Sequence, residues 1–179
     1  MKSLLGLAHA IDAINARIAR VAIWAVLVAV LVSAGNAAVR YLLSDSSNAW
    51  LELQWYLFAA TVMLGAPFVL KVNEHVRVDV VYSRLAPRRQ AAIDLFGFLV
   101  FLLPAIVLLG WMSWPYVVES WRTGETSSNA GGLIRWPFKA LVPLGCAMLA
   151  AQGVAEVVKR VAYLRGDYAM DTHYERPLQ

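Results

Sequence analysis

The sequence predicts an all-α integral membrane protein in which four transmembrane helices cross the bilayer. Of its 179 residues, 60% are hydrophobic, and the mean hydropathy is +0.57, whereas a soluble domain of average composition is about 45–50% apolar. The apolar residues fall in four blocks, and each block approaches the ~20 residues that a helix needs to cross a bilayer. These spans leave no room for a second, soluble domain.

The segment before the first span, residues 1–20, is expected to form an amphipathic helix at the membrane interface. Leu4, Leu7, Ile11 and Ile14 recur at steps of three and four residues, so they share one helical face. The opposite face carries His9, Asp12, Arg17 and Arg20. A helix with this pattern lies in the interface plane or docks on a partner, and the first reading is the one we favour.

The first two spans are expected at residues 21–43 and 50–70, joined by an outer loop at residues 44–49. The first span contains a run of small residues around an asparagine. Small residues allow helices to approach closely in lipid, and an asparagine there forms hydrogen bonds across the contact. The run is therefore a candidate contact for a partner helix, with packing inside the four-span bundle as the alternative. Its residues are Ser33, Ala34, Gly35, Asn36 and Ala37.

Two further spans and a second outer loop are expected at residues 91–118, 137–163 and 119–136. Pro104 lies within the third span, where it frees a backbone carbonyl that a neighbouring group must satisfy. In the fourth span Glu156 precedes Arg160 by four residues, the favourable order for an ion pair on a helix surface. We therefore expect Glu156 to be paired at the interface rather than to relay protons.

The basic residues indicate which ends of the spans face the cytoplasm. Lysine and arginine concentrate in residues 1–20, in the loop at residues 71–90, and from the end of the fourth span into the tail at residues 164–179. The opposite ends carry only Arg40, Arg122, Arg135 and Lys139. Because cytoplasmic loops carry an excess of Lys and Arg, both termini are expected in the cytoplasm and both outer loops in the periplasm.

The cytoplasmic loop at residues 71–90 is expected to hold a short interfacial helix. Its arginines are candidates for anchoring to anionic lipid headgroups, each worth on the order of 1 kcal/mol near the surface. They are Arg77, Arg84, Arg88 and Arg89. His75 and Asp79 are four residues apart and form a pair able to hold a metal ion or a proton. A lone His–Asp pair in an arginine-rich loop is weak evidence for catalysis, so a structural turn is the favoured reading.

Several kinds of active protein are disfavoured by what the spans lack. The histidines His9, His75 and His173 lie outside the spans, so a membrane haem has no axial ligands there. The spans carry no acid or base near mid-membrane, where a proton-driven carrier needs one. The single cysteine, Cys146, rules out an intrachain disulfide or a cysteine metal site. We expect a subunit rather than an enzyme, with no catalytic, substrate-binding or metal-binding residue and no cofactor.

Two longer stretches carry a family resemblance. In the first, an acid, a Gln-aromatic run and a Leu-Gly-Ala turn precede His-x-Arg-x-Asp, through Glu52, Gln54, Trp55, Gly65, Ala66, His75, Arg77 and Asp79. In the second, a Gly-Glu-x-Ser loop leads to Trp-Pro and Pro-Leu-Gly, through Gly124, Glu125, Trp136, Pro137, Pro143 and Gly145. In this pattern the chain resembles the small membrane subunit (DctQ-type small permease) of tripartite ATP-independent periplasmic (TRAP) transporters. Residues 127–145 are similar to the branch labelled for mannitol or chloroaromatic compounds.

The resemblance implies a division of labour. In such transporters a large multispan permease subunit holds the substrate and sodium sites and moves them by an elevator motion, while a periplasmic solute-binding protein delivers the solute. The small subunit is expected to be a stator in the bacterial inner membrane, supporting sodium-coupled uptake of a small organic acid. Its outer loop at residues 119–136 is a candidate contact for the binding protein. Membrane lipids, not nucleic acid, are the expected partners of its basic residues.

An alternative from a different class remains at this point. A membrane anchor or assembly subunit of an unrelated inner-membrane complex would have the same hydropathy and the same lack of mid-membrane charge. Only the family pattern of residues speaks against that reading.

Overall fold

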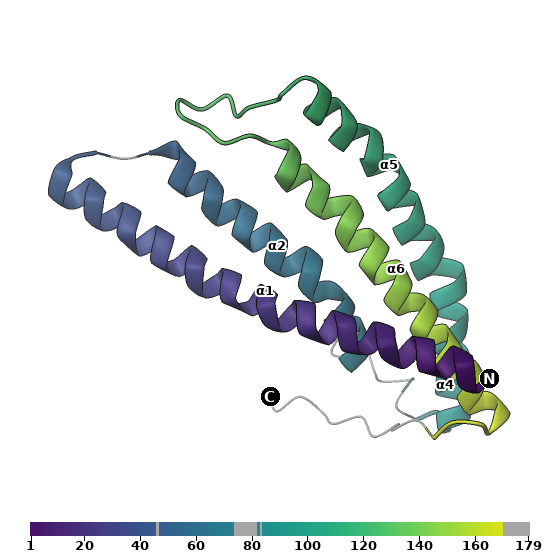
Figure 1. Ribbon diagram of the computed structural model, residues 1–179. Helices are drawn as coiled ribbons and strands as arrows, with labels where there is room; N and C mark the ends of the chain where they lie inside the picture. Colours follow the sequence, from purple (N-terminus) through teal and green to yellow (C-terminus); the bar gives the residue numbers. More distant parts are fainter. Residues whose placement is uncertain (46, 74–81, 83, 170–179) are drawn as a thin grey trace.

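Four long helical segments make up the described part of the computed structural model, which is residues 1–45, 47–73, 82 and 84–169 (Figure 1). They are α1 (Lys2–Leu43), α2 (Asn48–Val72), α4 (Pro87–Gly97) continued by the π-helical turn η1 (Phe98–Leu102) into α5 (Leu103–Arg122), and α6 (Trp136–Arg165). Each segment is long and apolar enough to cross a membrane. The β geometry in the described residues is an isolated bridge between Thr126 and Ile134. The prediction of an all-α fold with four spans is confirmed.

The first helix, α1, runs without a break across residue 20, where the sequence analysis placed a boundary. The stretch ARIARVAIWA, residues 16–25, contains neither glycine nor proline, so nothing in it interrupts a helix. At ~1.5 Å per residue, the 42 residues of α1 extend about 63 Å. This is twice the ~30 Å hydrocarbon core of a bilayer, so α1 must tilt strongly or project beyond the core.

The buried stripe of α1 is made of small and polar side chains rather than large apolar ones. Its members are Ala8, Asp12, Asn15, Ala19, Ala22 and Ala29. Leu7, on the apolar face, is 59% exposed. The face expected to be polar is divided, because Asp12 is buried in the bundle whereas His9, Arg17 and Arg20 are exposed. The N-terminal half of α1 therefore turns one acidic side chain toward the protein and Leu4 and Leu7 outward.

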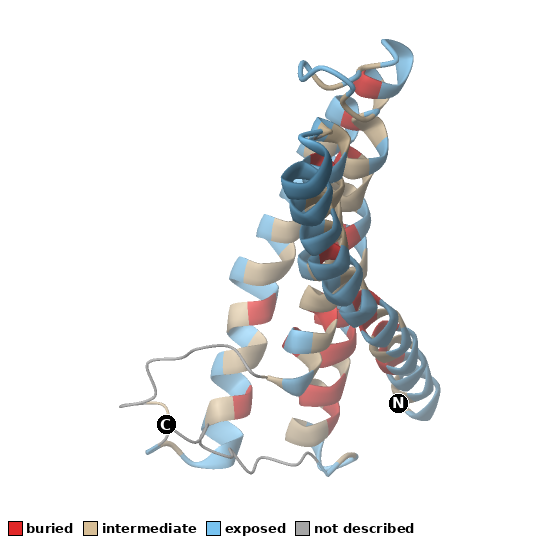
Figure 2. Ribbon diagram, turned by 90° about the vertical axis from the view of Figure 1, so that its left-hand side faces the viewer, coloured by how far each residue is buried: buried red, intermediate tan, exposed pale blue. Residues whose placement is uncertain are grey.

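The last helix, α6, is the centre of the bundle. It lies between α2 and α5 and also contacts α1, α4 and η1 (Figure 1). Buried residues lie toward the inside of the bundle, while the outer faces are mostly exposed (Figure 2). A Cβ added to Gly145 of α6 would stand 2.8 Å from Met63 Cβ and 2.9 Å from Met63 O. Only glycine therefore allows α6 and α2 to pack as closely as they do.

The π-helical turn η1 adjusts the third span just before Pro104. The Leu103 N–H donates to the Phe98 carbonyl, a five-residue step, and such a step widens the helix locally. The turn presses Leu102 and Leu103 against α6, because a Cβ on Gly153 would lie 3.0 Å from a methyl carbon of each. The π-helical turn thus lies beside Gly153 of α6, where the missing side chain leaves space for the two leucines.

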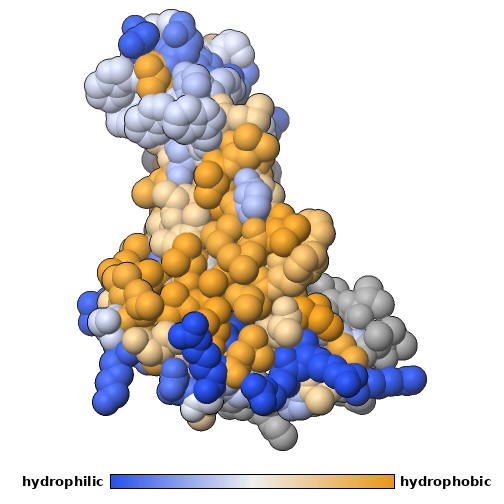
Figure 3. Space-filling view, turned by 90° about the vertical axis from the view of Figure 1, so that its right-hand side faces the viewer, coloured by the Kyte–Doolittle hydropathy of each residue, from blue (hydrophilic) through white to orange (hydrophobic). Residues whose placement is uncertain are grey.

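The outer surface of the described helices is largely apolar between two hydrophilic ends (Figure 3). Phe101 of η1 is 65% exposed, and Trp111 and Met112 of α5 are 79% and 66% exposed. A soluble monomer rarely exposes so large an apolar area. This surface matches the hydrocarbon region of a membrane, as the four apolar segments require.

Candidate functional site

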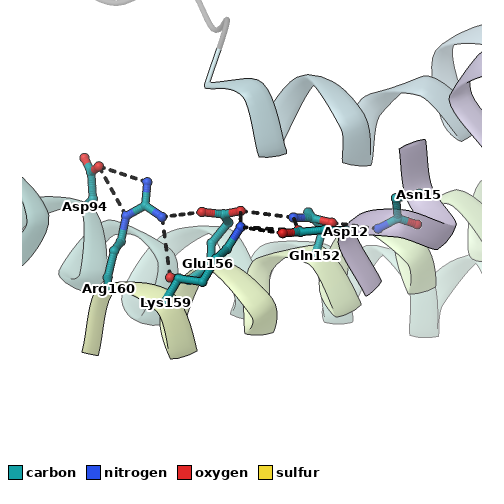
Figure 4. A network of polar contacts seen from close by, with 7 residues as sticks. All are labelled: Asp12, Asn15, Asp94, Gln152, Glu156, Lys159 and Arg160. Carbon is teal, nitrogen blue, oxygen red and sulfur yellow. Dashed lines mark hydrogen bonds and ion pairs between the residues drawn. The ribbon is translucent and has the colours of Figure 1, made fainter. Parts of the chain in front are cut away.

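Polar side chains gather at two places in the bundle, and an open groove lies at a third. The first place, which we call the inner clasp, joins α1, α4 and α6 (Figure 4). Its residues are Asp12, Asn15, Asp94, Gln152, Glu156, Lys159 and Arg160. The four members on α6 follow one another at steps of four, three and one residue, so they lie on one side of that helix.

The charged part of the inner clasp is a chain of ion pairs. The Lys159 ammonium lies 3.1 Å from Asp12 Oδ2 on α1 and also pairs with Glu156. The Arg160 guanidinium pairs with Glu156 on its own helix and lies 3.1 Å from Asp94 Oδ2 on α4. Three carboxylates and two cations leave a formal charge of −1. Each of the five charges has a partner of opposite sign, and together they connect three helices.

The amide part of the inner clasp continues the chain toward α1. Gln152 is 0% exposed. Its Nε2 donates to Asp12 Oδ1 at 2.7 Å and to Glu156 Oε1 at 3.0 Å, and its Oε1 accepts from Asn15 Nδ2 at 2.8 Å. Buried polar groups are stable only when they are hydrogen-bonded in this way. The amides therefore hold the carboxylates in place as well as joining α1 to α6.

The sequence analysis anticipated one bond of the inner clasp. The pairing of Glu156 with Arg160 occurs as expected, but both side chains are buried. The partners Asp12 and Asp94, and the role of Lys159, were not anticipated. The sequence did contain a signal for a contact between the two helices. Polar residues repeat along one face of the last span, and Asp12 and Asn15, three residues apart, share a face of α1.

The second polar cluster, which we call the outer cap, is built around Glu52 at the start of α2. Its Oε2 accepts from the Leu133 N–H at 2.8 Å, and its Oε1 accepts from Asn129 Nδ2 at 2.8 Å and from the Ser127 hydroxyl. Glu52, which the sequence analysis singled out only as a member of the first family motif, is 5% exposed. It is buried because the outer loop folds back over the carboxylate.

The outer loop of the cap depends on glycine and on backbone contacts with α2. Gly124 and Gly131 have φ of +60° and +69°, which L side chains rarely adopt. Asn48 Nδ2 donates to the Ala130 carbonyl at 3.2 Å, and Tyr56 OH donates to the Ile134 carbonyl at 3.2 Å. The loop between α5 and α6 is thus a folded element fastened to α2.

A second acid fastens the cap to α6. Glu125 pairs with Lys139, and its Oε1 lies 3.7 Å from Arg135 Nη1. The hydrogen bond from Lys139 lowers the pKa of Glu125 below its usual value. Lys139 also lies over the Tyr116 ring, 3.6 Å from its centroid. Glu125 is therefore an internal tie of the loop, with its charge already engaged.

The remaining residues of the second motif serve packing at the cap and in α6. Trp136 lies edge-to-face with Trp121, with ring centroids 4.5 Å apart. Pro137 lies in the first turn of α6 and Pro143 within it. Gly145 provides the close contact with α2 described above.

In the first motif, Gln54 and Trp55 follow Glu52 on α2. Trp55 is 66% exposed, and a Cβ on Gly65, next to Ala66, would meet no atom within 4 Å. His75, Arg77 and Asp79 lie outside the described residues, as does most of the expected interfacial helix of that loop.

The described arginines of the cytoplasmic loop differ in their surroundings. Arg84, Arg88 and Arg89 are all exposed. Arg88 Nη2 donates to the Leu164 carbonyl at 2.7 Å, so it satisfies a carbonyl in the last turn of α6. Arg84 and Arg89 keep the exposure that a contact with lipid headgroups needs.

The third place is an open groove of about 470 Å³ between α1 and α2, which we call the outer groove. Its lining residues are Ser33, Asn36, Ala37, Arg40, Tyr41, Leu51 and Gln54. The groove therefore contains three members of the small-residue run, while Ala34 and Gly35 lie on the adjoining exposed surface of α1.

No metal site is indicated in the described residues, where no group of three or more His, Cys, Asp or Glu side chains is arranged to hold an ion. Both polar clusters consist of side chains that are already bonded to one another. Both clusters therefore hold parts of the bundle together, one at each end of α6.

Comparison with known proteins assigns this bundle to a family. Neither a curated protein nor a solved structure matches the chain. A family model described as the DctQ component of tripartite ATP-independent periplasmic transporters matches residues 29–162, well over half of the chain. A transporter component is not an enzyme, and the reading as a subunit of an unrelated complex is set aside. The chain belongs to the DctQ family and is the small subunit of a TRAP transporter, a multi-pass membrane protein.

Proposed function

We propose that this chain is the stator of its transporter, a fixed scaffold beside which the large permease subunit moves the solute. The observation that carries the proposal is the placement of charge. Within the spans, residues 53–70, 95–118 and 140–155 contain no acidic, basic or histidine side chain. Ionisable groups near the middle of a membrane mark solute and ion pathways, so a chain whose spans lack them in these stretches is suited to support rather than conduction.

The two polar clusters support rigidity. The inner clasp ties α1, α4 and α6 at one end of the bundle, and the outer cap ties α2 to the α5–α6 loop at the other. Fasteners at both ends oppose sliding of one helix past another. A stator must resist such sliding, because the moving subunit pushes against it at every cycle.

The transport cycle follows from the family resemblance. The large permease subunit carries the substrate and sodium sites, and the periplasmic solute-binding protein delivers a small organic acid. The similarity of residues 127–145 to the branch labelled for mannitol or chloroaromatic compounds supports placing the chain near that branch. Sodium coupling belongs to the large subunit, which agrees with the lack of acidic side chains in residues 53–70, 95–118 and 140–155 of this chain.

The orientation in the bacterial inner membrane follows from the basic residues. Lys2, Arg17 and Arg20 lie on the N-terminal half of α1, and Arg84 and Arg89 lie exposed before and at the start of α4. This end of the bundle faces the cytoplasm by the positive-inside rule, and anionic headgroups are the partners of its free cations. The outer cap then faces the periplasm, where the binding protein approaches.

Reconstitution tests the stator proposal. Proteoliposomes receive the large permease alone, this chain alone, or both, with the binding protein, its solute and a sodium gradient. Uptake is expected only when both membrane subunits are present. Uptake by this chain alone would show that it conducts, and full uptake by the large permease alone would show that no stator is needed.

Contact between the outer cap and the binding protein is a second proposal, supported by the exposure of Glu119 and Arg122 at the end of α5. Arg122→Glu is expected to weaken binding-protein affinity without unfolding the loop. Glu125→Lys is a poor probe of this contact, because Glu125 ties the loop to Lys139. Unchanged affinity of the Arg122 and Glu119 charge-reversal variants would place the contact elsewhere.

A further inference from the structure

The geometry points to the outer groove as the seat of a transmembrane helix from the large permease subunit. That helix carries an acidic side chain opposite Arg40 and a hydrogen-bond donor about one turn away, opposite Asn36. The inference rests on the proposed function, because it takes the large permease as the partner. It adds which face of this chain the partner covers and which side chains the partner must bring.

The groove has the shape that a third helix fits. On α1 the lining residues Ser33, Asn36, Ala37 and Arg40 stand at positions i, i+3, i+4 and i+7, so they form one face over two turns, about 10.5 Å long. On α2 the facing wall includes Leu51 and Gln54, three residues apart. A furrow between two helical faces receives the ridge of another helix.

Small side chains make a close approach possible on the α1 wall. Ser33 and Ala37 lie one turn apart, and a Cβ added to neighbouring Gly35 would meet no atom within 4 Å. Interfaces between membrane helices are enriched in such residues because they let backbones approach. This part of the wall therefore allows the backbone of another helix to come into van der Waals contact with α1.

Asn36 is the observation that calls for a hydrogen-bond donor. Its Oδ1 is buried from solvent and accepts no hydrogen bond in the described residues. An amide oxygen left without a donor in an apolar environment is costly, and neighbouring helices are the usual source of such donors in a membrane. Because Asn36 lines the groove, its amide can turn toward a docked helix, where a serine, threonine, asparagine or glutamine supplies the donor.

Arg40 is the observation that calls for an acid. It is exposed in the last turn of α1 and makes no ion pair with the described residues. It stands four residues, about 6 Å of rise, from Asn36 on the same helical face. A helix that bears an acid and a donor three or four residues apart matches both groups at once.

A phospholipid matches only one of the two groups. Its phosphate pairs with Arg40, but below the phosphate it offers ester carbonyls and acyl chains, which cannot donate to Asn36 Oδ1. The unsatisfied amide lies further from the end of α1 than Arg40 does, and α1 ends at Leu43. The acceptor is therefore on the hydrocarbon side of the cation, and a helix is the occupant that serves both.

Photo-crosslinking in native membranes tests the inference with the whole transporter co-expressed. The probe p-benzoylphenylalanine replaces Tyr41, which lines the groove and is 88% exposed. In the matched control it replaces Trp111 of α5, an aromatic residue 79% exposed on another face. The expected result is an adduct with the large permease from position 41 and none from position 111.

The same samples separate failure of the inference from failure of the proposed function. If the large permease co-purifies but forms adducts only from position 111, the docking face is wrong and the function stands. Adducts from position 41 with lipid alone, or with a second copy of this chain, also overturn the inference. If no large permease co-purifies at all, the proposed function fails and the inference with it.

Substitutions then test the two polar groups. Asn36→Leu is expected to weaken retention of the large permease about threefold, the effect of one average interhelical hydrogen bond. Arg40→Glu is expected to weaken it further, whereas Arg122→Glu, the matched charge reversal in the last turn of α5, leaves it unchanged without binding protein present. Mapping the adduct identifies the facing acid, and reversing that acid to arginine is expected to restore retention with Arg40→Glu. Equal effects at Arg40 and Arg122, or no rescue, contradict the pairing.

Discussion

Replacing Lys159 by methionine removes the cation that joins α1 to α6 in the inner clasp. Lys159 pairs with both Asp12 and Glu156, and all three side chains are no more than 11% exposed. Removing one partner of a buried ion pair costs about 3–5 kcal/mol, because the other charge stays buried without compensation. Glu156 keeps Arg160, and Asp12 keeps the hydrogen bond from Gln152. We therefore expect the lower end of this range, about 3 kcal/mol, or roughly a hundredfold in the unfolding equilibrium.

A double substitution separates the ion pair from simple loss of packing. Asp12→Leu with Lys159→Met removes both charges of the pair between the helices and leaves Glu156 with Arg160. Replacing a buried pair by apolar residues of similar volume is often neutral or stabilising. The double variant is therefore expected to recover most of the loss caused by Lys159→Met alone. If the double loss equals or exceeds the sum of the single losses, uncompensated charge is not the cause.

Two measurements follow the inner clasp. The first is the free energy of unfolding in mixed micelles by denaturant titration, with Arg165→Met as control, since Arg165 is an exposed cation on the same helix. The second is maleimide labelling of Ala8→Cys in a Cys146→Ala background, because Ala8 is 1% exposed on the buried stripe of α1. Labelling is expected to rise with Lys159→Met and to stay low with Arg165→Met. If the two variants behave alike in both assays, the clasp does not hold α1 on the bundle.

Three further predictions concern the cap and the helix contacts. Gly145→Ala is expected to destabilise by ~1–3 kcal/mol, because its Cβ would meet backbone and side-chain atoms of Met63 within 3 Å; Gly65→Ala, with open space at that position, is the thermal-stability control, and equal losses contradict the close packing. Glu52→Ala is expected to speed hydrogen exchange at the Leu133 amide, because the Leu133 N–H donates a hydrogen bond to the Glu52 carboxylate. Unchanged exchange, measured by mass spectrometry, argues against the cap. The pKa of Glu125 is lowered by Lys139, so its contribution to loop order is complete above its ordinary value of 4.5 and is lost only as pH falls through the lower folded value. Tryptophan fluorescence should follow that loss on acidification, and Glu125→Gln should abolish it.

The number of the spans could be predicted from the sequence, because crossing a bilayer depends on local hydropathy. A run of ~20 apolar residues leaves the chain few alternatives to a helix, since lipid offers its backbone no hydrogen bonds. The distribution of Lys and Arg, the absence of charge near the middle of the spans, and the two family stretches are equally local. They led to a DctQ-type subunit before any contact was known, and the family comparison agrees over residues 29–162.

The contacts between helices were decided by the tertiary structure alone. Lys159 meets Asp12 across 147 residues of sequence, and Glu52 meets Leu133 across 81. Hydropathy and helical period say which face of a helix is polar, but they do not say whether water or another helix covers that face. For this reason Asp12 was placed on the polar face of its helix and the partners of Glu52 were not foreseen, although both side chains are buried. The order in which four helices pack depends on close approaches such as that of Gly145 to Met63, and these exist only once the helices have met.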